Sequence, residues 1–152
     1  MKAITWLASF TVGIAALSAT AFGSALEGWS TDLDKALEKA KTENKALLVE
    51  FTGSDWCPPC IAMRKNVFSK KEFVDAASKN FILVELDFPK GDKDLKEKNQ
   101  PFAEKYKIEG FPTVILLNSE GKEFNRFFAS QYPKTDEFLK HLDEALENKD
   151  LD

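Results

Sequence analysis

Short apolar runs that alternate with helical segments are the feature of this sequence that most limits its fold. The runs 46–51 and 81–88 are short and strongly apolar, which indicates buried strands rather than helices. Helical sequence separates them, as a crossover between parallel strands requires. Two further runs, 113–117 and 123–129, flank a turn at 118–121 and predict an antiparallel hairpin. The sequence therefore predicts an α/β fold with a central, mixed four-stranded sheet flanked by helices on both faces.

Capping residues and prolines predict where the helices begin. Ser30 or Thr31 is expected to cap the first helix. The charged segment 89–100 is expected to form a solvated loop with a partial helical turn, and Pro101 to start the next helix. Thr135 is expected to cap the last helix. The apolar stripe of that helix consists of Phe138, Leu139, Leu142 and Leu146.

The first 25 residues differ from the rest of the chain. Lys2 is their only charged residue, an apolar stretch follows it, and small residues end the stretch at 21–25. This order is typical of a secretory signal peptide. An uncleaved membrane anchor is the alternative, because the apolar stretch is nearly long enough to span a bilayer. We therefore expect a signal peptide at 1–25, a single domain at 26–152, and an exported, periplasmic protein.

Composition and charge narrow the possible functions. The chain has 152 residues, the length of one domain, and a formal net charge of -4. A nucleic-acid-binding protein would usually carry a basic face, so no nucleic-acid partner is expected. Two cysteines are too few for a disulfide-stapled scaffold. Two cysteines and one histidine are also too few for structural zinc, so no metal is expected, and His141 is expected on the surface of the last helix.

The motif Trp56-Cys57-Pro58-Pro59-Cys60 carries the chemistry that the sequence predicts. One helical turn brings two cysteines at this spacing within bonding reach. Cys57 falls at the start of a helix, where free N–H groups and the helix dipole favour its thiolate. Cys60 lies one turn inside. Cys57 is therefore predicted to attack a substrate disulfide and Cys60 to resolve the mixed disulfide. An inert disulfide and half of a zinc site are the alternatives.

Three strings of residues together indicate a family. They are the strand end Val49-Glu50-Phe51, the motif at 56–60, and Gly110-Phe111-Pro112-Thr113 before a strand. With these strings the chain resembles the thioredoxin-like family, particularly its exported members with a Trp-Cys-x-x-Cys motif, from about residue 29 to residue 146. The resemblance implies the thioredoxin fold and a cis bond between Phe111 and Pro112. It also implies that Pro112 packs against the sulfurs and that the backbone of Phe111 binds substrate peptide.

The same resemblance implies a role for Glu50, which stands at the position of the family's buried acid. A carboxyl group buried there should have a raised pKa and could take the proton of Cys60. The family usually has Asp at this position, and Glu85 stands where thioredoxins often place Lys. A solvated glutamate at the sheet edge is therefore the alternative for Glu50. Trp56 is expected to cover the active-site surface and contact substrate.

These features predict a thiol–disulfide oxidoreductase that acts on exported proteins or on a redox partner, as a monomer and without a cofactor. The alternative is a binding or chaperone module with the same fold, which turnover in an insulin-reduction assay would distinguish. A copper-handling protein is a third hypothesis, although no Met or His cluster accompanies the two cysteines. Reduction, oxidation and isomerisation all remain open, because the direction depends on the reduction potential and on the electron partner.

Overall fold

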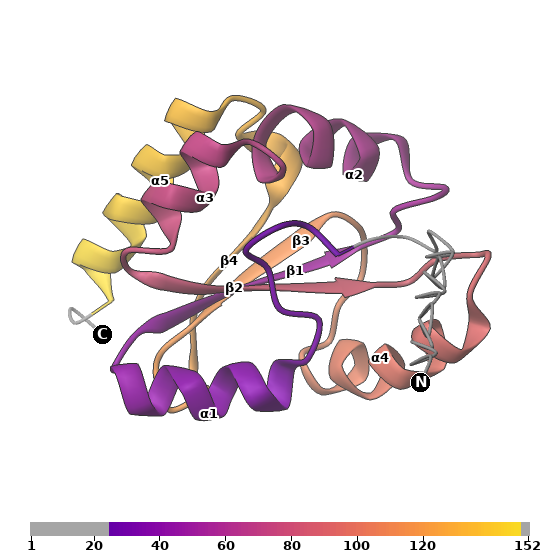
Figure 1. The fold of residues 1–152 in the computed structure, drawn as a ribbon, viewed down its shortest axis with the longest axis horizontal. Coiled ribbons are helices and arrows are strands. Elements are labelled where there is room, and N and C mark those ends of the chain that lie inside the picture. The colour runs from indigo at the N-terminus through magenta and orange to yellow at the C-terminus, as the bar shows by residue number, and fades with distance from the viewer. Residues whose placement is uncertain (1–24, 150–152) are drawn as a thin grey trace, which may run out of the picture.

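A single mixed sheet forms the centre of the molecule (Figure 1). The computed structural model describes residues 25–149, so residues 1–24 of the predicted signal peptide and residues 150–152 lie outside the described part. The strand order is β2-β1-β3-β4; β1 is parallel to β2 and antiparallel to β3, and β3 is antiparallel to β4. The predicted mixed four-stranded sheet is confirmed. The strands are β1 (Ala46–Thr52), β2 (Phe81–Asp87), β3 (Thr113–Leu117) and β4 (Glu123–Phe128).

Helices cover both faces of the sheet, as predicted (Figure 1). One face carries α1 (Leu33–Glu43) and α4 (Lys93–Lys105), and the other carries α2 (Pro58–Met63), α3 (Lys71–Ala77) and α5 (Thr135–Asn148). A π-helix, η1 (Arg64–Phe68), continues α2, and a short 3-10 helix, η2 (Ala129–Gln131), follows β4. Within residues 25–149, none of the helices has the length and apolar character needed to span a bilayer.

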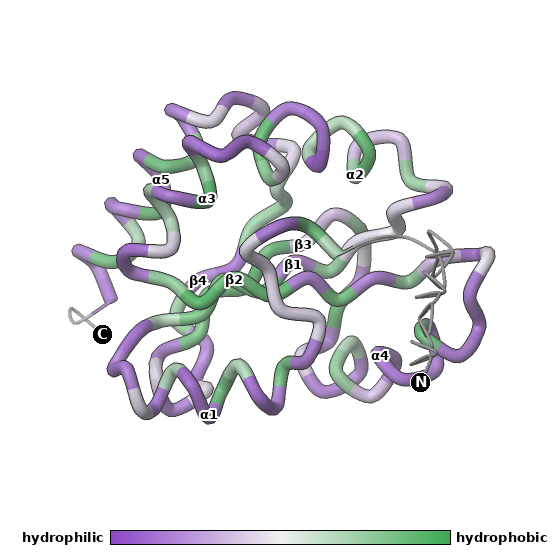
Figure 2. Tube along the Cα trace, viewed as in Figure 1, coloured by the Kyte–Doolittle hydropathy of each residue, from purple (hydrophilic) through white to green (hydrophobic). Residues whose placement is uncertain are grey.

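Alternation along β1 divides the core into two halves. Leu48 points into the apolar cluster beneath α3 and α5, whereas Leu47 and Phe51 point into the cluster beneath α1 and α4. The strands β1, β2 and β3 accordingly form the most hydrophobic part of the trace, whereas β4 also carries hydrophilic residues (Figure 2). Glu50 follows Leu48 by two positions and therefore shares the face that α2, α3 and α5 cover.

α4 begins earlier than the sequence predicts. The expected loop over 89–100 and the expected helix start at Pro101 are wrong, because α4 includes much of that segment and runs through the proline. The carboxylate of Asp92 caps the helix by accepting a hydrogen bond from a first-turn N–H at 3.0 Å. Asn99 is buried, and its side chain donates to the carbonyl of Asp87 at 2.8 Å. The cap and this tertiary hydrogen bond stabilise a helix whose Lys, Glu and Leu residues also favour it, so a high density of charge does not by itself indicate a loop.

Two other helix caps differ from expectation. Asp32, rather than Ser30 or Thr31, caps α1, and its carboxylate accepts a hydrogen bond from a first-turn N–H at 3.1 Å. Ser30 instead forms a parallel bridge with the edge of β2. Thr135 is the first residue of α5, and Lys134 occupies the cap position without a side-chain hydrogen bond to the backbone of the helix.

His141 is half-buried rather than exposed, contrary to the expectation of a surface residue. Its ring stacks on Tyr132, with centroids 4.1 Å apart, and meets Phe127 edge to face at 4.4 Å. Nε2 is buried without a hydrogen-bond partner among the described residues. Burial lowers the pKa of His141 below its usual 6.5, and the nearby charge of Glu144 opposes this shift.

Replacing His141 by Phe should remove a pH-dependent destabilisation. Because the pKa of His141 is lower in the folded state, the stability that its neutral form contributes is present above about pH 6.5 and is lost as the pH falls through the folded pKa. The difference in free energy of unfolding, wild type minus His141→Phe, should therefore decrease as the pH is lowered from about 7.5 to about 5. Urea denaturation across that range measures it, and a constant difference would contradict the prediction.

Candidate active site

Cys57 and Cys60 form a disulfide at the junction of β1 and α2. The two sulfurs lie 2.11 Å apart and the two Cα atoms 5.2 Å apart. Two backbone hydrogen bonds close the turn that leads into the motif: the N–H groups of Trp56 and Cys57 donate to the carbonyl of Gly53 at 3.3 and 3.0 Å. Cys57 is the N-cap of α2, and the two intervening prolines occupy its first turn. The predicted position of the pair, between a buried strand and a helix start, is confirmed.

The two cysteines have different surroundings. Cys57 is 4% exposed, whereas Cys60 is completely buried. The N–H of Gly53 points at the sulfur of Cys60, with the nitrogen 3.5 Å away. Among the first three residues of α2, only Cys60 has an N–H group, because the other two are prolines. Cys57 is therefore the more exposed of the two cysteines, while Cys60 is shielded by the protein.

The peptide bond between Phe111 and Pro112 is cis, as the resemblance implied. Pro112 directly precedes β3, and Thr113 lies opposite Phe51 in the register of β1 and β3. The cis bond therefore lies beside the end of β1 that leads into the motif. The carbonyl of Pro112 accepts a hydrogen bond from the N–H of Ala129 at 2.9 Å, which joins this loop to the turn after β4.

Trp56 links the motif to the loop that carries the cis bond. Its ring meets Phe111 edge to face, with centroids 5.9 Å apart. Its indole N–H donates to the carbonyl of Phe88 at 2.8 Å. A Cβ atom at Gly53 would come within 2.5 Å of the indole, so this close approach requires glycine. The exposed indole covers the surface next to the disulfide, as expected.

Two aspartates that the sequence reading missed hold this surface together. The carboxylate of Asp55 accepts hydrogen bonds from the N–H groups of Lys90 and Gly91, both at 2.9 Å. The carboxylate of Asp87 accepts from the N–H and the hydroxyl of Ser54. The hydrogen bonds to Asp55 also lower its pKa. These contacts join the turn after β1 to the loop after β2, and no local pattern in the sequence distinguishes these two aspartates from solvated ones.

Glu50 lies in the interior, so the alternative of a solvated edge glutamate is wrong. The residue is 1% exposed and sits in a central strand. Neither carboxylate oxygen has a hydrogen bond of good geometry within residues 25–149, although Thr52 lies close enough to favour the ionised form slightly. Burial, followed by the negative charge of Glu85, raises the pKa of Glu50 well above its usual value, and Arg64 opposes the rise. The side chain is therefore a neutral acid over a range in which ordinary glutamates are ionised.

Glu85 is the direct neighbour of Glu50 across the parallel pair β1 and β2. It is 5% exposed, and its carboxylate forms an ion pair with the guanidinium of Arg64 at 2.6 Å. Burial raises the pKa of Glu85, and the charge and hydrogen bond of Arg64 oppose that rise. Sequence reasoning noted Glu85 but missed Arg64. The sequence spacing could have indicated Arg64, because it stands one helical turn after Cys60 and so faces the same side of the helix.

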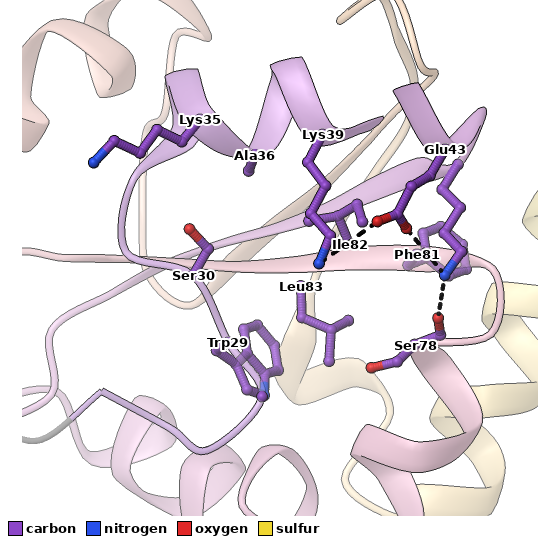
Figure 3. A pocket seen from close by; sticks show the side chains of 12 residues that line it. Trp29, Ser30, Lys35, Ala36, Lys39, Glu43, Ser78, Phe81, Ile82 and Leu83 are labelled. Carbon is purple, nitrogen blue, oxygen red and sulfur yellow. Dashed lines mark hydrogen bonds and ion pairs between the residues drawn. The ribbon is translucent and has the colours of Figure 1, made fainter. Parts of the chain in front are cut away.

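No other site within residues 25–149 matches this one. The described residues contain no group of three or more His, Cys, Asp or Glu side chains that could hold a metal ion. A cavity of about 400 Å³ lies between α1 and the edge of β2 (Figure 3). Its Lys39 and Lys45 share one carboxylate, that of Glu43, at 3.8 and 3.4 Å, so part of their positive charge is already compensated within the protein. The disulfide and its surroundings are therefore the candidate active site.

Comparison with known proteins agrees with this geometry. Residues 33–146 match the sequence model of a thioredoxin-like domain. The disulfide bond reductase DsbH of Chlamydia pneumoniae is 37% identical over 95 residues, which cover 60% of this chain and 57% of that protein. The thioredoxin-related protein DsbJ of Chlamydia pneumoniae is 36% identical over 64% of this chain and 29% of that protein. The matched region thus spans less than two thirds of either relative.

Solved structures and a plant relative extend the comparison. An H-type thioredoxin of Fagopyrum esculentum is 33% identical over 72% of this chain and 79% of that protein. A structure of a DsbH oxidoreductase has a TM-score of 0.71 at 29% identity and covers 90% of this chain and 95% of that chain. A thioredoxin of Thermus thermophilus shares the fold, with a TM-score of 0.62 at 23% identity over 79% of this chain and 88% of that chain. With its Cys57–Cys60 pair and a family match over residues 33–146, this chain belongs to the thioredoxin-like family.

Proposed function

We propose that this protein is an exported, periplasmic thiol–disulfide oxidoreductase that acts through Cys57 and Cys60 on exported proteins or on a redox partner. The observation that carries the proposal is the asymmetric disulfide, with one sulfur at a helix N-cap and the other fully buried. The similarity to the disulfide bond reductase DsbH and the thioredoxin-related protein DsbJ of Chlamydia pneumoniae supports disulfide chemistry, and the reductase favours reduction of substrate disulfides. The protein acts as a monomer on protein thiols or disulfides, without nucleic acid, metal or organic cofactor.

The proposed exchange proceeds in two steps. The thiolate of Cys57 attacks a substrate disulfide and forms a mixed disulfide, while one substrate sulfur leaves as a thiolate and takes up a proton. Cys60 then attacks Cys57, which releases the second substrate sulfur and forms the Cys57–Cys60 disulfide. Two electrons pass from the protein to the substrate, and the reverse sequence oxidises a substrate dithiol.

Glu50 is proposed to exchange the proton of Cys60. Its burial raises its pKa and so favours the protonated form, and it shares the sheet face that α2 covers. When Cys60 leaves as a thiolate during reduction of the disulfide, the acid donates its proton. When the Cys60 thiol attacks in the opposite direction, the carboxylate takes the proton back.

Trp56, Phe111 and Pro112 are proposed to bind the substrate peptide. Pro112 has no N–H, and its carbonyl already accepts a hydrogen bond from Ala129. The backbone of Phe111 is therefore the nearer source of hydrogen bonds for an extended peptide. The exposed indole of Trp56 offers that peptide an apolar surface beside Cys57.

Replacing Cys60 by Ser should trap a mixed disulfide between Cys57 and substrate. Attack by Cys57 remains possible in this variant, whereas resolution does not. Cys57→Ser should trap little, because Cys60 is completely buried. Mass spectrometry of each variant after incubation with an oxidised substrate measures the adduct, and the opposite pattern would contradict the assigned roles.

Turnover of insulin disulfides by the wild type, with Cys57→Ser as the inactive control, tests the proposed function itself. Repeated reduction of insulin in the presence of a thiol donor is expected. A protein that binds unfolded chains but reduces no insulin would be the binding module instead.

Replacing Glu85 by Gln should move the pH dependence of exchange to lower pH. The charge of Glu85 raises the pKa of Glu50, and Arg64, which lowers it, remains in the variant. The proton of Glu50 should therefore be lost at lower pH than in the wild type. Stopped-flow reduction of the Cys57–Cys60 disulfide across a pH series measures the shift.

Glu50→Gln is the reference for that experiment, because it keeps the shape of the side chain and cannot ionise. It should lose the pH-dependent limb and slow exchange on the order of a hundredfold. A wild-type rate in Glu50→Gln, or an unshifted profile in Glu85→Gln, would remove Glu50 from the mechanism.

A further inference from the structure

A second cavity, of about 230 Å³, lies directly beside the candidate active site. Trp56 and Phe111 line it, and they are the neighbours in sequence of Cys57 and Pro112. Pockets that enclose whole small molecules usually measure about 300–1,000 Å³. The size of this cavity suits one side chain of a bound peptide rather than an organic cofactor.

The apolar wall of this cavity is already in place without a ligand. The rings of Phe88 and Phe111 stack with centroids 5.2 Å apart, and Trp56 meets Phe111 edge to face. The indole N–H of Trp56 donates a hydrogen bond to the carbonyl of Phe88, which fixes the Trp56 ring as well. A side chain that enters therefore meets a rigid surface and does not have to order these rings.

The polar wall is positively charged. Lys90 and Lys96 line the cavity from the loop after β2 and from α4, and the ammonium of Lys90 lies 5.2 Å from the centre of the Trp56 ring. The backbone of Lys90 is held in place because its N–H donates a hydrogen bond to the carboxylate of Asp55. Among residues 25–149, no carboxylate forms an ion pair with either ammonium group.

A glutamate or aspartate side chain matches both walls. Its methylene groups can pack on the aromatic rings, while its carboxylate accepts hydrogen bonds from the two ammonium groups, which are donors only. A basic side chain would meet two like charges, and an amide oxygen could accept a hydrogen bond from an ammonium group but would bring no negative charge to offset the two positive ones.

We infer that this cavity binds an acidic side chain that lies close in sequence to the substrate's disulfide cysteine. Substrates or redox partners with an acidic residue near the reactive disulfide are then the preferred class. The inference rests on the proposed function, because it concerns the same exchange reaction and the same peptide-binding surface.

A series of short disulfide peptides tests the inference. The peptides are identical except for Glu, Gln, Lys or Phe at one of the two positions on either side of the cysteine. Rate constants for their reduction by the reduced protein are measured by stopped flow. At low ionic strength the Glu peptide should react roughly fivefold faster than the Gln peptide at the favoured position, and added salt should reduce the ratio.

Lys96→Glu should abolish or reverse that preference, which is measured as the ratio of the Glu-peptide rate to the Gln-peptide rate within the variant. A measurable rate for the Gln peptide shows that the variant is folded and active. Lys98→Glu is the matched control, because it makes the same charge change on α4 at a residue that does not line the cavity and whose charge acts on Asp32. It should keep the wild-type preference.

Every other outcome overturns either the inference alone or the proposed function together with it. Equal rates for Glu and Gln peptides, or the same loss in Lys96→Glu and Lys98→Glu, would overturn the inference and leave the proposed function intact. A preference for Phe that Lys96→Glu does not change would make the cavity an apolar subsite and would also overturn it. Failure of the wild type to reduce any of the peptides would refute the proposed function together with the inference.

Discussion

Burial of β1 on both faces is the constraint on which the rest of the structure depends. All seven of its residues are buried, and β2 and β3 pair with its two edges. Leu47, Leu48 and Phe51 point into two separate apolar clusters, and burial of each such side chain contributes about 1.5–3 kcal/mol. A strand held in this way has little freedom. The turn that follows it, and the Cys57–Cys60 disulfide after that turn, are therefore held in a defined position beside the cis bond.

Glu50 is the exception within this buried strand. Its pKa is raised above 4.5 in the folded state, so the folded chain keeps its proton at pH values where the unfolded chain has lost it. The stability that protonated Glu50 contributes is therefore fully present below about pH 4.5 and is lost as the pH rises through the folded pKa. The positive charge of Arg64 limits the cost of ionising Glu50, although the negative charge of Glu85, its ion-pair partner, has the larger and opposite effect. A neutral acid that weakens the fold at higher pH is better explained by chemistry at the neighbouring disulfide than by packing.

Much of the fold could be predicted from the sequence because its signals are local. The apolar run of β1, the spacing of Cys57 and Cys60, and the strand that follows Pro112 each depend on residues within a few positions. The burial of Glu50 could not be decided in this way, because only the strand order shows that β1 is central. The ion pair of Arg64 with Glu85 joins residues 21 positions apart. The start of α4 differs, because its signals are local: Asp92 caps a run of good helix formers, and their high charge does not predict a loop.

Cycling of the Cys57–Cys60 pair between disulfide and dithiol is tested most directly by equilibration with glutathione. The protein is incubated in buffers of graded reduced and oxidised glutathione, from both the oxidised and the reduced starting state, and its free thiols are alkylated and counted by mass spectrometry. A redox-active pair should reach the same two-electron equilibrium from either side, with a midpoint between about -270 and about -120 mV, the range of thioredoxin-fold exchange enzymes. A pair that stays oxidised below about -300 mV would be a structural disulfide and would contradict the proposed chemistry.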